Sequence, residues 1–466
     1  MARRDSYAIP FRSGRGLPSS AQPAHAVAAP APAPALADQT VSLEREVSPA
    51  AKWATGVAVF LAVSKFHAYL GILAMIRAPM LASVAALVLL FMDTKRWRPG
   101  DLKQHWIPKT LGVLVLVAFG SIPFGIYPSQ SLDTFNNVLG KTLLIALMVW
   151  AVARTERGTL FMVRTLTLAI VAAGFLAITK GRVDNTGRLS GGYTYDPNDI
   201  SLLAVTGIPL VVWWALDKRN KFGKPVLLAL PLLFKVIFAS MSRGAFIGFL
   251  AMTAGFILLG LGPVSKKVKR VALAAGLGVL VAMPFFPAKY LRQMKTITSD
   301  DDYNQTSITG RKEVWKRGFS YARARPLFGV GLGNFNSAEG RSEVSMERSA
   351  RGRGFKWGTA HNSYVQVLAE LGFIGGGCFF GLMFGSIISL VLVHRRSAHS
   401  DMLPPLFAIA MTGFAGAAAF LSWGYYDLTY VMIALACAML MRARGDWSAA
   451  SGTLPAPATV SGRARR

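Results

Sequence analysis

Long apolar runs, separated by short polar or basic segments, recur along most of this chain. Each run has about 15–25 residues, the length that a helix needs to cross a bilayer. A helix also satisfies its own backbone hydrogen bonds in lipid, which an isolated strand does not. The pattern therefore predicts an all-α integral membrane protein with about twelve membrane-spanning helices. The runs lie at about residues 52–76, 79–93, 108–125, 136–153, 159–179, 198–216, 225–241, 244–262, 269–287, 363–393, 402–421 and 427–442.

One polar segment, residues 288–361, is much longer than the other gaps between apolar runs. We expect it to form a long loop outside the membrane. The loop would connect transmembrane helices 1–9, in residues 51–287, with helices 10–12, in residues 362–443. Residues 1–50 are rich in Pro and Ala, and residues 444–466 in Ser, Ala, Gly and Pro. Such composition cannot bury a core, so we expect two disordered cytoplasmic tails.

Lys and Arg cluster in alternate short loops, and this pattern predicts the orientation in the membrane. The basic loops are residues 93–98, 154–157, 217–221, 265–270 and 394–396. Short cytoplasmic loops of membrane proteins are enriched in Lys and Arg. We therefore expect both termini in the cytoplasm and the 288–361 loop on the outer side. That loop is itself basic, but long loops are largely exempt from the charge rule.

Composition agrees with a membrane protein. Of the 466 residues, 53% are hydrophobic and 16% are charged, and the mean hydropathy is +0.40. The formal net charge of +28 alone would suit a nucleic-acid-binding protein. Because the basic residues lie in short loops between apolar runs, we expect no nucleic acid partner. Cys378 and Cys437 both lie in apolar runs, and we expect buried thiols without a disulfide.

Arg243 lies in the run Ser242-Arg243-Gly244-Ala245, between two apolar runs with almost no loop. An ionisable residue at a membrane boundary is a candidate for function. The alternative is an arginine at a helix end whose guanidinium reaches the membrane surface. The small flanking residues leave room for another group to approach, which favours function. Lys235, within the preceding apolar run, is expected to line the same cavity.

Arg311 follows Thr309-Gly310 in the polar segment. Thr309 is a suitable N-cap for a helix from about Gly310 to Ala322, with Arg311 in its first turn. A cation is unfavourable at this positive end of the helix dipole, whereas the amides of the first turn attract anions. Arg311 therefore indicates an anionic partner. An ordinary solvated charge is the alternative.

His361 and Asn362 stand at the end of the polar segment, where an apolar run begins. An imidazole takes up or releases a proton near neutral pH, so His361 is a candidate base. An interfacial histidine with a structural hydrogen bond is the alternative. Glu370 lies roughly half a turn round the helix from His361. We expect Glu370 to pack against another element rather than to pair with His361.

Other polar motifs indicate structure more than chemistry. Asp196 followed by Pro197 is typical of a helix start, which leaves Asn198 at the membrane boundary as a weaker candidate. The run Gly329-Val330-Gly331-Leu332-Gly333 lacks the context of a phosphate loop and predicts a tight turn. Asp300-Asp301-Asp302 is typical of a solvated loop, and no zinc spacing of Cys and His occurs, so we expect no metal or cofactor.

In this order, around one long loop, these motifs resemble those of the O-antigen ligase family of bacterial membrane proteins, which includes glycan polymerases. The resemblance is best from about Gly191 to Phe380. Its motifs are Asp196-Pro197-Asn198, Ser242-Arg243-Gly244-Ala245, Thr309-Gly310-Arg311 with Trp315, Pro326 with Gly329 and Gly331, and His361-Asn362 with Glu370-Leu371-Gly372. The resemblance implies a membrane-embedded glycosyltransferase fold in the bacterial inner membrane, with the long loop in the periplasm and no metal requirement.

The resemblance also implies an activity: transfer of a glycan from undecaprenyl pyrophosphate to an acceptor hydroxyl, in surface polysaccharide biosynthesis. It implies that Arg243 and Arg311 bind the pyrophosphate and that His361 holds or deprotonates the acceptor hydroxyl. The residues expected to bind substrate are Asn198, Lys235 and Asn362. The expected partners are the lipid-linked glycan, membrane lipids, and an acceptor that is a glycan, lipid A-core or a glycoprotein.

Three other functions remain open. The motifs do not separate a ligase from a polymerase that joins the repeat units of an O-antigen, capsule or exopolysaccharide. A transporter of anions or other solutes also suits many spans with membrane-embedded Lys and Arg, although no internal repeat relates the two halves. An assembly subunit without an active site is the third, which the two arginines and the histidine disfavour.

Overall fold

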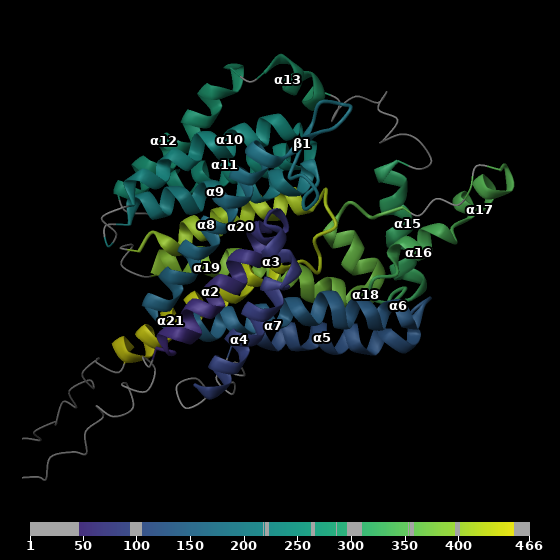
Figure 1. Ribbon diagram of the computed structural model, residues 1–466, viewed down its shortest axis with the longest axis horizontal. Coiled ribbons are helices and arrows are strands. Elements are labelled where there is room, and N and C mark those ends of the chain that lie inside the picture. The colour runs from purple at the N-terminus through teal and green to yellow at the C-terminus, as the bar shows by residue number, and fades with distance from the viewer. Residues whose placement is uncertain are drawn as a thin grey trace, which may run out of the picture. The chain divides into compact units, whose positions relative to one another are not determined.

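The structure, a computed structural model, is built almost entirely of helices (Figure 1). It describes residues 46–93, 105–217, 219, 223–261, 266–285, 287–295, 310–352, 354, 358–396 and 401–451. Contacts within the chain separate Met1–Leu43 from Glu44–Arg466, and all described residues belong to the second unit.

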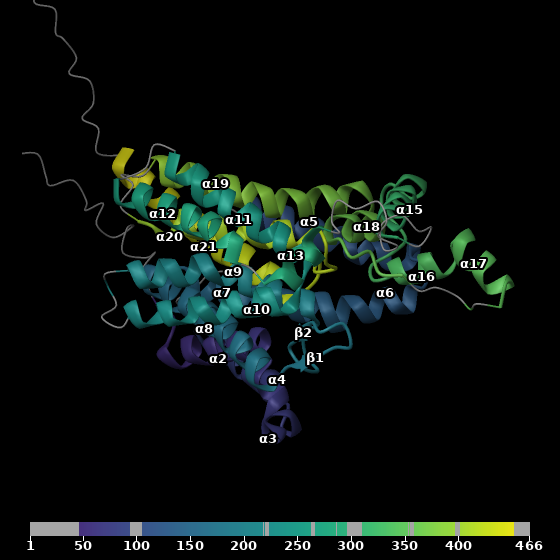
Figure 2. The ribbon, with the colours of Figure 1, turned by 90° about the horizontal axis from the view of Figure 1, so that it is seen from above.

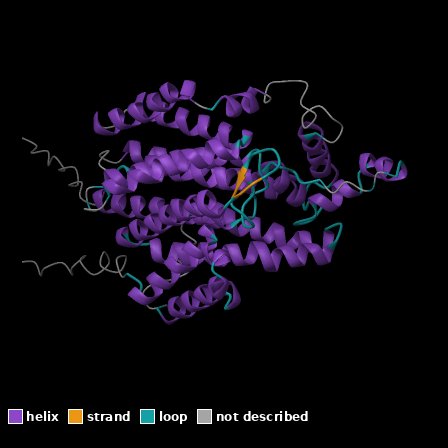
Figure 3. Ribbon diagram, turned by 45° about the horizontal axis from the view of Figure 1, so that its top comes forward, coloured by secondary structure: helices purple, strands orange, loops and turns teal. Residues whose placement is uncertain are grey.

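The helices of the first half follow the apolar runs of the sequence. They are α2 (Pro49–Ser64), η2 (Phe66–Tyr69), α3 (Gly71–Met75), α4 (Ala78–Met92), α5 (Trp106–Phe124), α6 (Pro128–Thr134), η4 (Phe135–Leu139), α7 (Gly140–Ala153), α8 (Glu156–Lys180) and α9 (Pro197–Leu216). Between α8 and α9, two short strands pair antiparallel, β1 (Arg182–Val183) and β2 (Leu189–Ser190). Figure 3 shows this strand pair in orange among the loops.

The second half contains the long polar segment and the last apolar runs. Its helices are η5 (Lys224–Leu228), α10 (Ala229–Ser240), α11 (Arg243–Leu261), α12 (Lys266–Ala282), η6 (Met283–Phe285), α13 (Ala288–Lys295), α15 (Arg311–Ala324), α16 (Phe335–Gly340), α17 (Glu343–Ala350), α18 (Ser363–Phe380), η7 (Gly381–Gly385), α19 (Ser386–Arg396), α20 (Leu403–Ala418) and α21 (Asp427–Ser451). The polar segment is thus partly helical, and α15, α16 and α17 lie at one end of the bundle (Figures 1 and 2).

The expected helical architecture is confirmed in the described residues, and it has the features of a multi-pass membrane protein. Five helical stretches there are long and apolar enough to cross a membrane: Trp106–Phe124, Pro128–Ala153, Glu156–Lys180, Pro197–Leu216 and Ser363–Arg395. Shorter apolar helices lie at other expected runs, namely Pro49–Ser64, Ala78–Met92, Arg243–Leu259 and Leu403–Ala418.

The first apolar run differs from the expected single span over residues 52–76. α2 ends at Ser64, and Lys65 closes it in the left-handed conformation, with φ of 53°. The Lys65 ammonium then lies 3.8 Å from a carboxylate oxygen of Asp427, at the start of α21. Ending the helix here lets a charged side chain reach a carboxylate instead of remaining in an apolar stretch.

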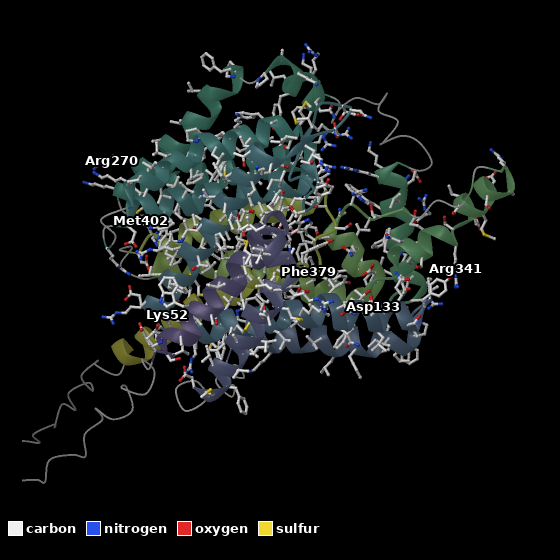
Figure 4. All side chains as sticks on the ribbon, viewed as in Figure 1. Lys52, Asp133, Arg270, Arg341, Phe379 and Met402 are labelled. Atoms are coloured by element: carbon white, nitrogen blue, oxygen red, sulfur yellow. The ribbon has the colours of Figure 1, made fainter. Side chains whose placement is uncertain are left out.

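Polar residues from distant parts of the chain lie at both ends of the helices. Figure 4 shows Lys52, Arg270 and Met402 at one end of the bundle, and Asp133 and Arg341 at the other. Arg270 belongs to one of the basic loops, whereas Arg341 belongs to the long polar segment. These two residues therefore lie at different ends of the helices.

α18 is broken at Gly372, where φ of 67° and ψ of −170° are accessible essentially only to glycine. A break in a helix leaves backbone groups on both sides in need of partners. On the far side, the amide of Phe373 donates to the carbonyl of Pro326 at 2.8 Å. The chain after Pro326 therefore enters the break.

On the near side of the break, the freed carbonyls of α18 accept amides from the same loop. Val330 donates to Ala369 at 2.8 Å, and Gly331 donates to Glu370 at 3.0 Å. Residues 326–335, which we call the glycine loop, thus replace the helical hydrogen bonds that α18 loses at the break.

The Glu370 side chain holds the glycine loop as well. Its two carboxylate oxygens accept the amides of Gly333 at 3.0 Å and Phe335 at 3.1 Å. The expected tight turn is confirmed, because Gly329, Gly331 and Gly333 have φ of 59°, 96° and 74°. This buried contact agrees with the packing role expected for Glu370.

We expect Gly372→Ala to destabilise the protein, because a Cβ atom there would lie 2.3 Å from the Pro326 carbonyl oxygen. The backbone strain alone would cost about 1–3 kcal/mol. Gly377→Ala is the matched control, since a Cβ at this position of α18 meets nothing within 4 Å. Melting temperatures of both variants in detergent test the prediction, which fails if Gly372→Ala melts no lower than Gly377→Ala.

Candidate functional site

The start of α9 is fixed by its own sequence. Asp196 Oδ1 accepts the amides of Asn198 and Asp199, each at 2.7 Å, and Pro197 is the first helical residue. The expected cap at Asp196 is confirmed. The Asp196 residue remains exposed, so its charge is available to groups from other elements.

Arg188, the residue before β2, reaches this helix start. Its Nη2 donates to Asn198 Oδ1 at 2.7 Å, and its Nε donates to the carbonyl of Ser240 at 3.0 Å. Ser240 is the last residue of α10. The guanidinium therefore joins the start of α9 to the end of α10.

Arg243, the first residue of α11, is a near neighbour of Arg188. Burial lowers the pKa of the Arg188 guanidinium, and the positive charge of Arg243 adds to that shift. The carboxylates of Asp184 and Asp196 act in the opposite direction. Two guanidinium groups are thus held within repulsive range of each other, an arrangement that an anion between them would stabilise.

The glycines after Arg243 allow a neighbouring helix to pack closely on α11. A Cβ atom at Gly244 would lie 2.6 Å from Cβ of Phe420, and one at Gly248 would lie 2.6 Å from the carbonyl oxygen of Gly413. α11 therefore packs closely on α20 at this end. The expected room beside Arg243 is largely taken by α20 and by Phe420, which follows it, and this packing fixes the backbone that carries the arginine.

Arg311 is the first residue of α15, in the first turn as expected. Gly310 is the N-cap, and no side-chain cap hydrogen bond is made by this residue. Thr309, the expected cap, lies outside the described residues. The first turn of α15 thus combines a guanidinium with backbone amides at the positive end of the helix dipole.

α15 also positions the chain before His361. Trp315 Nε1 donates to the carbonyl of Ala360 at 2.9 Å. The amide of His361 donates to Ser422 Oγ at 3.0 Å. Between these two contacts, His361 has a φ of 44°, in the left-handed region that few non-glycine residues adopt. Contacts from two different elements therefore hold His361 in a strained backbone conformation.

The turn before α21 connects His361 to the start of α9. Ser422 accepts the His361 amide, and its neighbour Trp423 donates from Nε1 to Asp199 Oδ1 at 2.6 Å. The amide of Trp423 donates to Ser363 Oγ at 2.8 Å. Two consecutive residues of one turn thus bridge the first turn of α9 and the first turn of α18.

The imidazole of His361 is in a mixed electrostatic environment. Burial lowers its pKa, the positive charge of Arg311 lowers it further, and the carboxylate of Asp196 raises it. The net shift is downward, so the imidazole is neutral at neutral pH and able to accept a proton. Asp196 acts on both His361 and Arg188. The start of α9 therefore acts on Arg188 and His361, of which Arg188 is also within electrostatic range of Arg243 and His361 within range of Arg311.

The residues expected to bind substrate have different positions. Asn362 caps α18, because its Oδ1 accepts the amides of Tyr364 at 3.0 Å and Val365 at 3.1 Å. Asn198 Oδ1 accepts a hydrogen bond from the Arg188 guanidinium, as described above. Lys235 lies on α10 and lines a cavity beside α13.

The structure groups no metal-binding set among the residues that it describes. There, no three His, Cys, Asp or Glu side chains are placed to hold a metal ion. The Asp300-Asp301-Asp302 run lies outside the described residues.

Sequence reasoning missed Arg188, Ser422 and Trp423. Arg188 had a usable signal, because it is a cation in the short segment between the apolar runs 159–179 and 198–216, and this segment alternates with the basic loops. Ser422 and Trp423 had none, since the hydrogen bonds they make to the site join residues 61 and 224 positions apart in the sequence.

Residues 227–380 match the family model described as O-antigen ligase. The matched residues include Arg243, Arg311 and His361. The resemblance inferred from the motifs is therefore confirmed for this part of the chain, which is similar to the O-antigen ligase family. A search of curated proteins finds no match to the chain.

We expect Arg311→Gln to raise the pKa of His361 and Asp196→Asn to lower it, because the first change removes a cation and the second removes a carboxylate. Asparagine keeps the helix cap at position 196. Chemical shifts of isotope-labelled histidine over a pH titration measure both changes, with His361→Gln to assign the signal among the six histidines.

Lys316→Gln is the control for that titration, since Lys316 lies on the same helix as Arg311 but pairs with Glu313. This variant should leave the pKa of His361 unchanged. Shifts of the same sign in the Arg311 and Asp196 variants would contradict the proposed neighbourhood.

Proposed function

We propose that this protein is a membrane glycosyltransferase that moves a glycan from undecaprenyl pyrophosphate to an acceptor hydroxyl, as an O-antigen ligase does. The observation that carries the proposal is that Asp196, at the start of α9, acts on both Arg188 and His361, while Arg188 is within electrostatic range of Arg243 and His361 within range of Arg311. Arg243, Arg311 and His361 lie within the O-antigen ligase match. An anion-binding group beside a neutral imidazole suits a reaction that releases a diphosphate while a hydroxyl loses its proton.

The arginines would hold the diphosphate of the donor. Guanidinium groups bind phosphate oxygens in pairs of parallel hydrogen bonds. The first turn of α15 would add backbone amides to this anion site. When the bond between the anomeric carbon and the diphosphate oxygen breaks, its electron pair leaves with the diphosphate. Preorganised cations stabilise the charge that develops there.

His361 would act on the acceptor. The acceptor hydroxyl oxygen attacks the anomeric carbon, and its proton passes to the neutral imidazole. Burial and Arg311 lower the pKa of His361, which keeps the imidazole in the neutral form needed for this step. The strained backbone at His361, held by Trp315 and Ser422, would fix the direction from which the imidazole meets the hydroxyl.

The assignments of Asn198, Lys235 and Asn362 to substrate binding remain part of the proposal. Asn198 supports it through its hydrogen bond with the Arg188 guanidinium. Asn362 would contribute its amide group, because its oxygen already caps α18.

For the placement in the membrane, we propose about twelve spans in the bacterial inner membrane. Both termini would be cytoplasmic and the 288–361 segment periplasmic. The separation of Arg270 from Arg341 at opposite ends of the bundle supports this orientation (Figure 4). The site would then face the periplasm, where a flipped lipid-linked glycan is available, and the apolar helices would face the polyprenyl chain.

The matched family domain favours glycosyl transfer over transport, because it is an O-antigen ligase domain. A polymerase that joins repeat units of an O-antigen, capsule or exopolysaccharide is the second candidate, since this domain occurs in polymerases as well as in ligases. The two reactions share the donor and differ in the acceptor, which is a second lipid-linked glycan for a polymerase and lipid A-core, another glycan or a glycoprotein for a ligase.

We expect Arg311→Gln and His361→Ala to reduce transfer by at least about 10²-fold, the size of effect seen when a transition-state donor or a general base is lost. Arg188→Gln should have the same direction of effect. Arg323→Gln is the matched control, because Arg323 lies on α15 and stacks on Phe319. A membrane-inserted His361→Ala protein with wild-type transfer would refute the site.

Gels of surface polysaccharide and of lipid-linked glycan from a deletion strain distinguish the two reactions. If the deleted protein is a ligase, the strain accumulates long polymer on the lipid carrier and none reaches the final acceptor. If the deleted protein is a polymerase, the strain transfers only single repeat units to the acceptor. If the deletion changes neither pool, the proposed transfer reaction is wrong.

A further inference from the structure

A cavity of about 520 Å³ lies between α10 and α13, beside the loop that carries Arg188. Much of its lining is apolar or aromatic and comes from Pro231, Phe234, Phe238, Ala239, Met241, Pro287 and Tyr290. The aromatic rings form one packed wall, since Phe238 meets Tyr290 edge-on at 5.4 Å and lies 6.1 Å from Phe234. The wall offers a surface for a hydrocarbon chain.

Two ammonium groups share this apolar cavity. Lys235 and Lys289 both line it, and neither makes an ion pair with a carboxylate among the described residues. A Cβ atom at Gly187 would lie only 2.3 Å from Lys289 Nζ. The positive φ of Gly187, 79°, also favours glycine. The absence of a side chain at Gly187 therefore lets the Lys289 ammonium lie against the backbone of the loop, at the residue before Arg188.

The helix that forms one side of the cavity is basic and amphipathic. α13 buries Tyr290 and Met294, while Lys289, Arg292 and Lys295 are exposed. A basic amphipathic helix of this kind is suited to the boundary between an apolar phase and anionic lipid headgroups. Its presence makes a lipid phosphate a better fit for the two lysines than a free water-soluble anion.

We infer that this cavity binds the phosphate ester of a lipid, with Lys235 and Lys289 paired to the phosphate and the first part of the hydrocarbon chain against the aromatic wall. The ligand has two sources with this chemistry: a polyprenyl phosphate, or an anionic phospholipid of the membrane. The inference rests on the proposed membrane function, but it concerns a cavity lined by two lysines and not the arginines around α9.

The cavity lies close to the proposed transfer site. Met241 lines it and follows Ser240, whose carbonyl accepts from Arg188. Gly187, also in the lining, precedes Arg188. A lipid phosphate in the cavity would thus contact the chain segments on either side of Arg188 and Arg243. Its binding would therefore help to hold those arginines in place.

Native mass spectrometry of the full-length protein in detergent tests the inference, with undecaprenyl monophosphate and phosphatidylglycerol as the two probes. Wild-type protein should retain at least one of them. The double variant Lys235→Gln/Lys289→Gln should bind it roughly thirty-fold more weakly, since each lysine near an anionic lipid contributes about fivefold. Lys224→Gln/Lys269→Gln, at two lysines outside the cavity, should remain within about threefold of wild type, because neither side chain lines the cavity and a charge elsewhere on the surface has a small effect.

The two probes identify the source. Retention of undecaprenyl monophosphate alone supports the carrier lipid, and retention of phosphatidylglycerol supports a membrane phospholipid. Equal binding by wild type and the cavity variant, or an equal loss in the control variant, overturns the inference. Melting temperatures in detergent show whether each variant is folded. Transfer by wild-type protein without cavity binding would refute this inference alone, whereas cavity binding without transfer would refute the proposed function alone.

Discussion

The break of α18 at Gly372 is the constraint on which the arrangement of the site depends. The glycine loop fills the break and takes over the hydrogen bonds that the helix loses there. Glu370 then binds two further amides of that loop. Because the loop follows α15, fixing it against α18 also fixes α15, which packs on α18. α15 in turn supplies Arg311 and, through Trp315, holds the residue before His361.

The charged groups that this scaffold positions determine what the site can bind. The carboxylate of Asp196, at the start of α9, acts on both Arg188 and His361, and the charges of Arg243 and Arg311 act on the same two residues in turn. Holding like charges near one another costs free energy that a bound anion would recover. Burial and the charge of Arg311 lower the pKa of His361 and keep it neutral, so one arrangement serves both proposed tasks: to bind a diphosphate and to accept a proton.

The sequence was a good guide where the signal is local. Apolar runs located α5, α8 and α9, and Asp196 with Pro197 marked the start of α9. Arg311 was correctly placed in the first turn of a helix. These predictions succeed because length, capping and hydropathy act over a few neighbouring residues.

The sequence was a poor guide where contacts between distant segments decide the structure. α2 stops at Lys65, whose ammonium lies 3.8 Å from a carboxylate on α21, far away in the sequence. Gly372 breaks α18 because the glycine loop is there to receive the freed groups, and glycine within an apolar run does not reveal such a partner. The bridge of Ser422 and Trp423 to His361 and Asp199 is likewise visible only in three dimensions.

The most direct test of the central claim is a reaction with purified full-length protein and an undecaprenyl pyrophosphate-linked glycan, in the presence of an acceptor. Product analysis would count new glycosidic bonds and free undecaprenyl pyrophosphate together. The account predicts that the two appear in equal amounts. Donor that remains intact, or that loses its glycan to water without any new bond to the acceptor, would contradict it.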